Sequence, residues 1–125
     1  MNGNIEYDTA ESGLRAVLKD YQEIAMRAIW MSPEGLGSKQ VWDKANEGLR
    51  GKIISRASVI NFLEAMREMG ALKGDEKTRK GGHRWIYSPA MTEVGFKTFI
   101  AETILGNLKR DFPEETKKAL TSIPI

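Results

Sequence analysis

The order of its apolar periodicities constrains the fold of this chain more than any other feature. Three stretches carry apolar residues at steps of three and four, which is helical spacing, over residues 11–30, 38–47 and 55–69. A charged, glycine-rich stretch bounded by two short extended segments follows, and helical spacing returns over residues 92–110. The sequence therefore predicts a mainly α fold with one small β hairpin.

Capping and breaking residues set the expected ends of these helices. The spacing of Asp8 and Glu11 resembles a capping box for the first helix. Ser38 and Ser55 are suitable N-caps for the second and third, and Gly70 closes the third. The expected core stripes are Leu14, Val17, Leu18, Tyr21, Ala25, Ala28 and Ile29, then Val41, Trp42 and Ala45, then Val59, Phe62, Leu63 and Met66.

The hairpin is expected between the third helix and the last one. Residues 71–73 begin its first strand, and residues 84–88 form its second, with Trp85 and Tyr87 on one face. The polar, glycine-rich residues 74–83 between them are typical of an exposed hairpin tip.

Positive charge is concentrated in the middle of the chain. The net charge is only +2, yet residues 50–84 hold nine Lys or Arg and four acids, a net charge of +5. The rest of the chain therefore carries −3. Such segregation favours one basic face and an anionic partner. An unevenly charged, solvated surface is the alternative interpretation.

The sequence does not indicate a disulfide-bonded protein, a metal-binding protein, an enzyme or a membrane protein. The chain has no cysteine and one histidine, so we expect no disulfide, no metal site and no cofactor. No Ser/His/Asp group can be assembled, so we do not expect an enzyme. No apolar run approaches the roughly 20 residues that cross a bilayer, and residues 1–13 are polar. We expect a cytoplasmic protein without a membrane partner.

Three helices followed by a basic hairpin is the winged helix-turn-helix pattern, which binds double-stranded DNA. The third helix would enter the major groove, which is about 12 Å wide. The residues expected to contact bases are Arg56, Ala57, Ser58, Ile60 and Asn61, with Arg56 suited to guanine, Asn61 to adenine and Ala57 or Ile60 to a thymine methyl group. The residues expected to contact phosphates are Arg50, Lys52, Ser55, Lys77, Arg79, Lys80, His83 and Arg84.

Five short segments of the chain also carry a family resemblance. They are residues 21–30, 41–42, 58–63, 70–72 and 85–89. Through them the chain resembles the penicillinase-repressor family, which includes the methicillin-resistance and copper-responsive repressors, over roughly residues 14–110. The resemblance implies a winged-helix N-terminal domain, a helical C-terminal dimerisation domain and repression at a palindromic operator.

The chain departs from that family at several points. It lacks the C-terminal cysteine pairs of the copper-responsive members, which excludes copper sensing by that route. No cleavage site like that of the antibiotic-responsive members is recognisable. Ile60 stands where a polar or basic base-reading residue is expected, and residues 49–54 form a longer connection than the usual turn.

The last helix presents an apolar stripe beyond the expected DNA-binding domain of residues 1–89. Its members are Phe96, Phe99, Ile100, Ile104 and Leu108. An exposed patch of that size is rare in monomers, so we expect residues 90–125 to form a homodimer interface. The alternative is that this helix folds back on the first helix of its own chain.

The sequence thus predicts a sequence-specific, dimeric DNA-binding transcription regulator. The competing hypothesis is a winged-helix module that uses the same surface on a protein partner, without sequence-specific DNA binding. The operator, the regulated genes, the inducing signal, the direction of regulation and the mode of release from DNA are not encoded in any recognisable motif.

Overall fold

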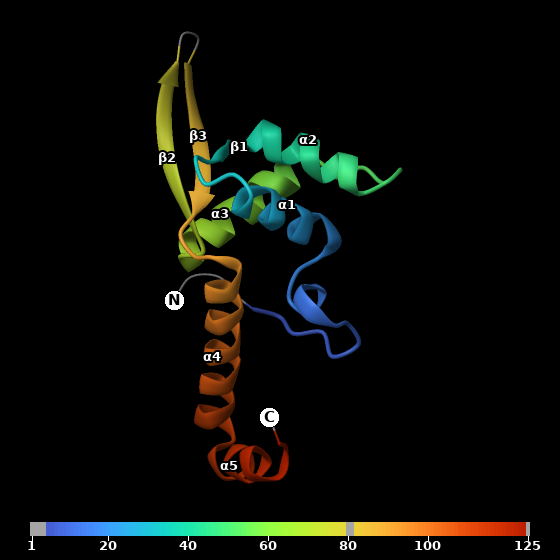
Figure 1. The fold of residues 1–125 in the computed structure, drawn as a ribbon, viewed down its shortest axis with the longest axis vertical. Coiled ribbons are helices and arrows are strands. Elements are labelled where there is room, and N and C mark those ends of the chain that lie inside the picture. Colours follow the sequence, from blue (N-terminus) through green and yellow to red (C-terminus); the bar gives the residue numbers. More distant parts are fainter. Residues whose placement is uncertain (1–4, 80–81, 125) are drawn as a thin grey trace. The chain divides into compact units, whose positions relative to one another are not determined.

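The computed structural model describes residues 5–79 and 82–124, which are mainly helical with a small three-stranded antiparallel sheet (Figure 1). This agrees with the predicted fold class at that level. Along the chain the elements are η1 (Gly13–Ala16), α1 (Asp20–Trp30), β1 (Leu36–Gly37), α2 (Ser38–Gly48), α3 (Arg56–Met69), β2 (Leu72–Arg79), β3 (Gly82–Pro89), α4 (Glu93–Asp111) and α5 (Pro113–Ser122). Contacts divide the chain into two compact units, Met1–Glu93 and Val94–Ile125.

The core of the first unit lies where α1, α2 and α3 pack together and against the sheet. The stripe predicted for α3 is confirmed, since Val59, Phe62, Leu63 and Met66 are all buried. Val41 and Ala45 of α2 are fully buried as expected. Met26 of α1 is also fully buried, although it lies outside the predicted stripe.

The prediction of one continuous helix from residue 11 is wrong. Asp8 forms a local turn instead, in which its carboxylate accepts a hydrogen bond from the Ala10 amide at 2.9 Å. The short helix η1 follows, and Lys19 then adopts an extended conformation with ψ 168°. The helix α1 begins only after it, with the Gln22 side chain accepting a hydrogen bond from the Lys19 amide at 2.9 Å. The local Asp8 turn competes with helix formation, as short acidic side chains often do.

The other helix ends lie close to their expected positions. Ser55 is the N-cap of α3, and its hydroxyl accepts a hydrogen bond from the Ser58 amide at 3.0 Å. Gly70 closes α3 in the left-handed region, with φ +93°. The N-cap of α2 is Gly37 and not Ser38, and the Gln40 side chain accepts the Gly37 amide at 2.8 Å.

The hairpin strands are longer than the sequence indicated. They pair from Leu72 opposite Pro89 to Arg79 opposite Gly82, so most of the segment predicted as a loop is strand (Figure 1). Hydrogen bonding between strand backbones needs no alternation of apolar residues, so the polar composition of this segment gave no sign of its strand structure. The two-residue strand β1 was not predicted either. It pairs with β3 through Leu36 opposite Tyr87 and Gly37 opposite Ile86.

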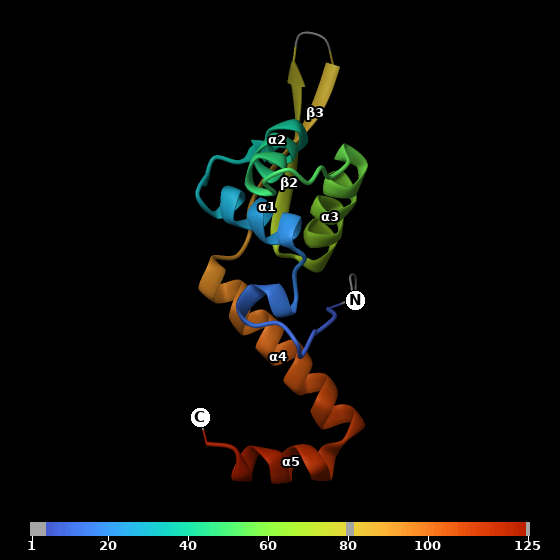
Figure 2. The ribbon, with the colours of Figure 1, turned by 90° about the vertical axis from the view of Figure 1, so that its right-hand side faces the viewer.

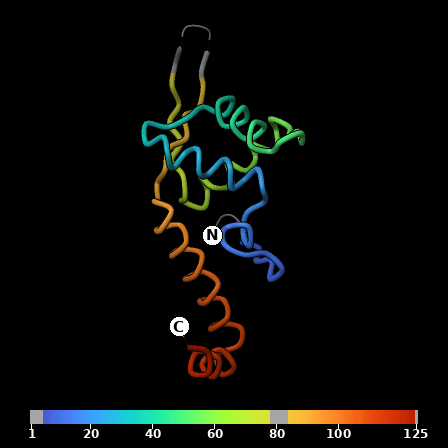
Figure 3. The backbone as a smooth tube through the Cα atoms, turned by 45° about the vertical axis from the view of Figure 1, so that its right-hand side comes forward, coloured from blue at the N-terminus to red at the C-terminus, as the bar shows by residue number. Residues whose placement is uncertain are grey.

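The second unit consists of α4 and α5, which meet at a sharp bend (Figures 1 and 3). Pro113 starts α5, and the Thr116 hydroxyl donates to the Leu108 carbonyl at 3.0 Å across the bend. Within the described ranges, no helix combines the length and the apolar composition that a bilayer-spanning segment needs.

Candidate nucleic-acid interface

The N-terminus of α2 opens onto a small pocket in which three cationic side chains meet. The pocket has a volume of about 260 Å³ and is lined by Gly37, Ser38, Lys39, Gln40, Arg56, Arg84 and Trp85. We call it the cationic pocket. Its walls come from four separate elements, the strand β1, the starts of α2 and α3, and the strand β3.

Two exposed arginines lie at the N-terminus of α2. Arg56 donates from Nη2 to the Ser38 hydroxyl over 3.3 Å. The Nη2 atom of Arg84 lies 3.4 Å from the position that a Cβ on Gly37 would take, so this guanidinium lies against the bare glycine backbone. The first amides of a helix have no intrahelical acceptor and carry partial positive charge. The pocket therefore combines guanidinium and amide donors, which suits a phosphate oxygen.

The third cation, Lys39, has exposed partners of its own on α2. Its Nζ lies 3.1 Å from the Asp43 carboxylate and 6.0 Å from the centre of the Trp42 ring, and its side chain is 64% exposed. An exposed ion pair of this kind contributes at most about 1 kcal/mol. Lys39 can therefore exchange Asp43 for an incoming phosphate at small cost.

The pairing of β1 with β3 explains why these residues converge. Gly37 is paired with Ile86, two residues from Arg84, and α2 begins at the next residue, Ser38. The strand β1 thus places the start of α2 beside the hairpin. The start of α3 reaches the same place because Trp42 of α2 donates its indole N–H to the Ile54 carbonyl at 2.8 Å, two residues before Arg56.

The residues expected to contact bases occupy different positions on α3. Ala57 and Asn61 are exposed, and Ile60 is half-buried. Ser58 is half-buried, and its hydroxyl accepts a hydrogen bond from Ser55 at 2.8 Å. Arg56 is exposed, lines the cationic pocket and donates a hydrogen bond to the Ser38 hydroxyl there.

The residues expected to contact phosphates are only partly brought together. Arg84 lines the cationic pocket, and Lys77 is exposed and paired with it across the hairpin. Lys52 instead forms an exposed ion pair with Asp20 at 3.4 Å. Arg50 is exposed in the loop before α3, and the Ser55 hydroxyl is occupied as the N-cap. The side chains of Arg79, Lys80 and His83 lie outside the described part of the structure.

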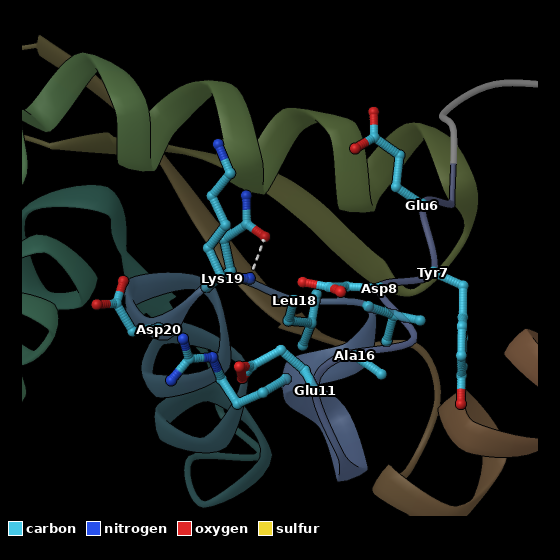
Figure 4. A pocket seen from close by; sticks show the side chains of 11 residues that line it. Glu6, Tyr7, Asp8, Glu11, Ala16, Leu18, Lys19 and Asp20 are labelled. Atoms are coloured by element: carbon cyan, nitrogen blue, oxygen red, sulfur yellow. Dashed lines mark hydrogen bonds between the residues drawn. The ribbon is translucent and has the colours of Figure 1, made fainter.

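A larger recess of about 790 Å³ lies at the N-terminal segment, before and at the start of α1 (Figure 4). Figure 4 shows the acidic residues Glu6, Asp8 and Glu11 around it, together with Lys19 and Asp20. This mixture of charges is unsuited to a polyanion. No group of three or more His, Cys, Asp or Glu that could hold a metal occurs among the residues that the structure describes.

The hairpin is fastened to α3 by a hydrogen-bonded group. The Tyr87 hydroxyl donates to the Glu64 carboxylate at 2.5 Å, and Arg67 pairs with the same carboxylate at 2.8 Å. The Arg67 guanidinium also lies over the Trp85 ring, 5.5 Å from its centre. Trp85 and Tyr87 therefore lie on one face of β3, as predicted, and both contact residues of α3. Figure 2 shows α3 beside the base of the hairpin, with the hairpin extending beyond the helices.

The charges in this group shift each other's ionisation. The hydrogen bond from Arg67, followed by that from Tyr87, lowers the pKa of Glu64 below its usual value. Burial, followed by the contact with Glu64, raises the pKa of Tyr87. Glu64 is thus held as an anion and Tyr87 as a neutral donor, which fixes the position of the hairpin on α3.

This link predicts an acid-dependent contribution to stability. Because the folded-state pKa of Glu64 is lowered, its stabilisation is complete above its unfolded pKa of about 4.3 and is lost as the pH falls through the folded value. Glu64→Gln should therefore be destabilised by about 1 kcal/mol near pH 6, and the difference from the parent should shrink towards pH 3. Urea unfolding across this range measures it. A difference that stays constant with pH would contradict the assignment.

Comparison of the chain with protein-family models, with curated proteins and with solved structures gives no match. The site is therefore interpreted from its own geometry.

Two features of the site were missed from the sequence. Lys39 was not selected because it lies outside the cationic segment 50–84. Its position next to the N-cap of α2 could have identified it as a candidate phosphate-binding residue, because the start of a helix attracts anions. Glu64 was not singled out from the sequence either. Its partner Arg67 lies three residues on, a spacing that favours an ion pair, whereas the contact with Tyr87 spans 23 residues and leaves no local pattern.

Proposed function

We propose that this chain is a sequence-specific, DNA-binding transcription regulator of the winged helix-turn-helix class. The observation that carries the proposal is the cationic pocket, where Arg56 of α3 and Arg84 of the hairpin meet Lys39 at the start of α2. In this class the third helix and the hairpin contact one duplex. One pocket built from both elements is well suited to hold a phosphate between them.

The proposed interaction follows from the charges and the exposed surface. A phosphate of one strand enters the cationic pocket and accepts hydrogen bonds from the two guanidinium groups. This fixes the register of α3, and the exposed residues Ala57 and Asn61 then face the base edges in the major groove. Lys77 extends the positive surface along the hairpin towards the flanking backbone.

The resemblance to the penicillinase-repressor family favours repression at a palindromic operator. The order of three helices, a basic hairpin and a further helical segment is compatible with such a protein. Repression in this arrangement would come from the bound protein excluding the transcription machinery from the operator.

In vitro selection from a random duplex library, followed by fluorescence anisotropy on the selected site, tests the proposal. We expect saturable binding whose affinity falls with salt, with a log–log slope of about −0.9 for each phosphate contacted. Protein that is folded by circular dichroism but selects no duplex at low salt would rule out the proposed function. Tight binding of a protein partner without DNA binding would favour the interaction-module hypothesis.

We further propose that the second unit forms a homodimer, with a revised contact surface. Phe96 and Ile100 are 2% and 8% exposed in the single chain, whereas Leu108 is 41% exposed. The exposed apolar groove lies between α4 and α5, with a volume of about 370 Å³. It is lined by Leu105, Leu108, Phe112, Glu115, Thr116, Ala119, Leu120 and Ile123.

A second copy suits this groove better than another partner because α5 is self-complementary in charge. Glu114 and Glu115 lie in its first turn, and Lys117 and Lys118 follow one turn later. Two antiparallel copies of α5 would place the acids of one against the lysines of the other. We expect Phe112→Ala combined with Leu120→Ala to shift the mass measured by light scattering after size exclusion from dimer to monomer. A monomeric parent at micromolar concentration would contradict the dimer.

A further inference from the structure

We infer that α3 reads A·T base pairs, through thymine methyl groups and one adenine, and that no arginine on it reads guanine. The inference rests on the proposed DNA binding and names the bases that the same surface recognises. It follows from which side chains of α3 are available at its exposed face.

Arg56, the residue that the sequence suggests for contact with guanine, has another hydrogen-bond partner in the structure. In the major groove, guanine is recognised chiefly by Arg or Lys through its O6 and N7 atoms. Arg56 is the only cation in the first three turns of α3, and its exposed guanidinium donates a hydrogen bond to Ser38 over 3.3 Å where both residues line the cationic pocket. A phosphate bound there would hold Arg56 away from the base edges.

The next cation on α3 is also unavailable. Arg67 is paired with Glu64 at 2.8 Å and covers the Trp85 ring. Glu64 would otherwise be an acceptor for cytosine, yet its carboxylate already receives Arg67 and the Tyr87 hydroxyl. Neither Glu64 nor Arg67 is therefore free to contact a G·C base pair.

In the first two turns of α3, the surface that remains after Arg56 consists of small, apolar or uncharged side chains, and the exposed acid Glu68 lies further along the helix. Ala57, Ile60 and Asn61 are spaced three and four residues apart and so lie next to one another on α3. Ala57 and Ile60 offer only methyl and methylene groups, which in the major groove match the thymine 5-methyl group. A base edge that offers only hydrogen-bond donors and acceptors would find no partner on them.

Asn61 supplies the polar contact. Its side chain is exposed and makes no hydrogen bond to another described residue. An Asn amide can donate to N7 of adenine and accept from its N6 amino group, which distinguishes adenine from the other bases. Asn61 beside Ala57 and Ile60 therefore favours a short half-site core with one adenine and adjacent thymines.

The first test uses the unmodified protein and the site found by in vitro selection. Each thymine of that site is replaced in turn by uracil, which removes only the 5-methyl group. Burying one such group is worth about 0.8 kcal/mol, so we expect one or two positions in each half-site at which affinity falls about fourfold. A site that binds equally well with uracil at every position would overturn the inference while leaving DNA binding intact.

The second test pairs a variant with a modified base. Asn61→Ala should lower affinity about ten- to one-hundredfold for the selected site, and replacing the contacted adenine by purine, which lacks N6, should then cost nothing more. Asn107→Ala, the same change on α4, should leave affinity unchanged. A selected core dominated by G·C pairs, with base preference altered by Arg56→Gln, would overturn the inference. Failure to select any duplex would overturn the proposed function, and this inference with it.

Discussion

Replacing both Arg56 and Arg84 by glutamine should weaken DNA binding more than any other pair of exposed substitutions in this chain. A hydrogen bond to a charged group contributes roughly 1.5 to 3 kcal/mol, so each single variant should lose about ten- to one-hundredfold in affinity. Glutamine keeps much of the length of the side chain and removes its charge. Fluorescence anisotropy on the selected duplex measures the change.

The salt dependence distinguishes one shared phosphate from two separate ones. If both guanidinium groups hold the same phosphate in the cationic pocket, the double variant should reduce the log–log slope by about 0.9. Two independent phosphates would reduce it by about 1.8. The single variants should also be non-additive in a double-mutant cycle, as residues that share a partner are.

Arg110→Gln is the matched control for this experiment. It makes the same change in net charge at an exposed arginine of α4, which is paired with Asp111 at 2.9 Å. Affinity and slope should stay close to those of the parent. If Arg110→Gln weakened binding as much as Arg84→Gln, the effect would be one of net charge and the cationic pocket would not be the phosphate site.

The local parts of this fold could be predicted from the sequence, because local rules determine them. The stripe of α3 from Val59 to Met66 is set by helical spacing, and its ends are set by Ser55 and Gly70. The break between α4 and α5 follows from Pro113, whose missing amide donor is tolerated at the start of a helix.

The non-local parts could not be predicted in the same way. The strand β1 has two residues, too few for any alternation, and it exists only because β3 offers an edge to Leu36 and Gly37. The destination of Arg56 depends on that pairing, because β1 brings Ser38 within reach of it. A single sequence therefore indicated which residues are cationic, but not which of them share a site.

Gly35→Ala should be the most destabilising small substitution among those that leave the charged surface unchanged. Gly35 ends the turn before β1 with φ +96°, a conformation that costs a residue with a side chain roughly 1 to 2 kcal/mol. A Cβ there would also lie 2.6 Å from the Ile86 side chain and 3.0 Å from the Tyr87 backbone oxygen. The Ile86 side chain can rotate away from the added Cβ, but the Tyr87 backbone oxygen can be relieved only if the strand β3 moves.

Gly70→Ala separates the cost of the positive-φ backbone conformation from the cost of the close contacts that a Cβ makes at Gly35. Gly70 has φ +93°, almost the same as Gly35, and a Cβ added to it meets nothing within 4 Å. It should therefore show the cost of the backbone conformation alone, whereas Gly35→Ala adds overpacking worth about 1 to 3 kcal/mol. Urea unfolding of both variants gives the difference, and equal destabilisation would show that the turn adapts without moving β3.

Gly35→Ala should weaken DNA binding by more than its loss of folding stability explains. A shift of Gly35 away from Tyr87 opens the pairing of β1 with β3, and that pairing holds the start of α2 beside Arg84. At a temperature where Gly35→Ala is still folded, its DNA affinity should fall and its salt slope should decrease by about 0.9, as in the arginine double variant. Gly70→Ala, with the cationic pocket intact, should keep the parental slope. A folded Gly35→Ala protein with unchanged slope would mean that the phosphate is held without the help of α2.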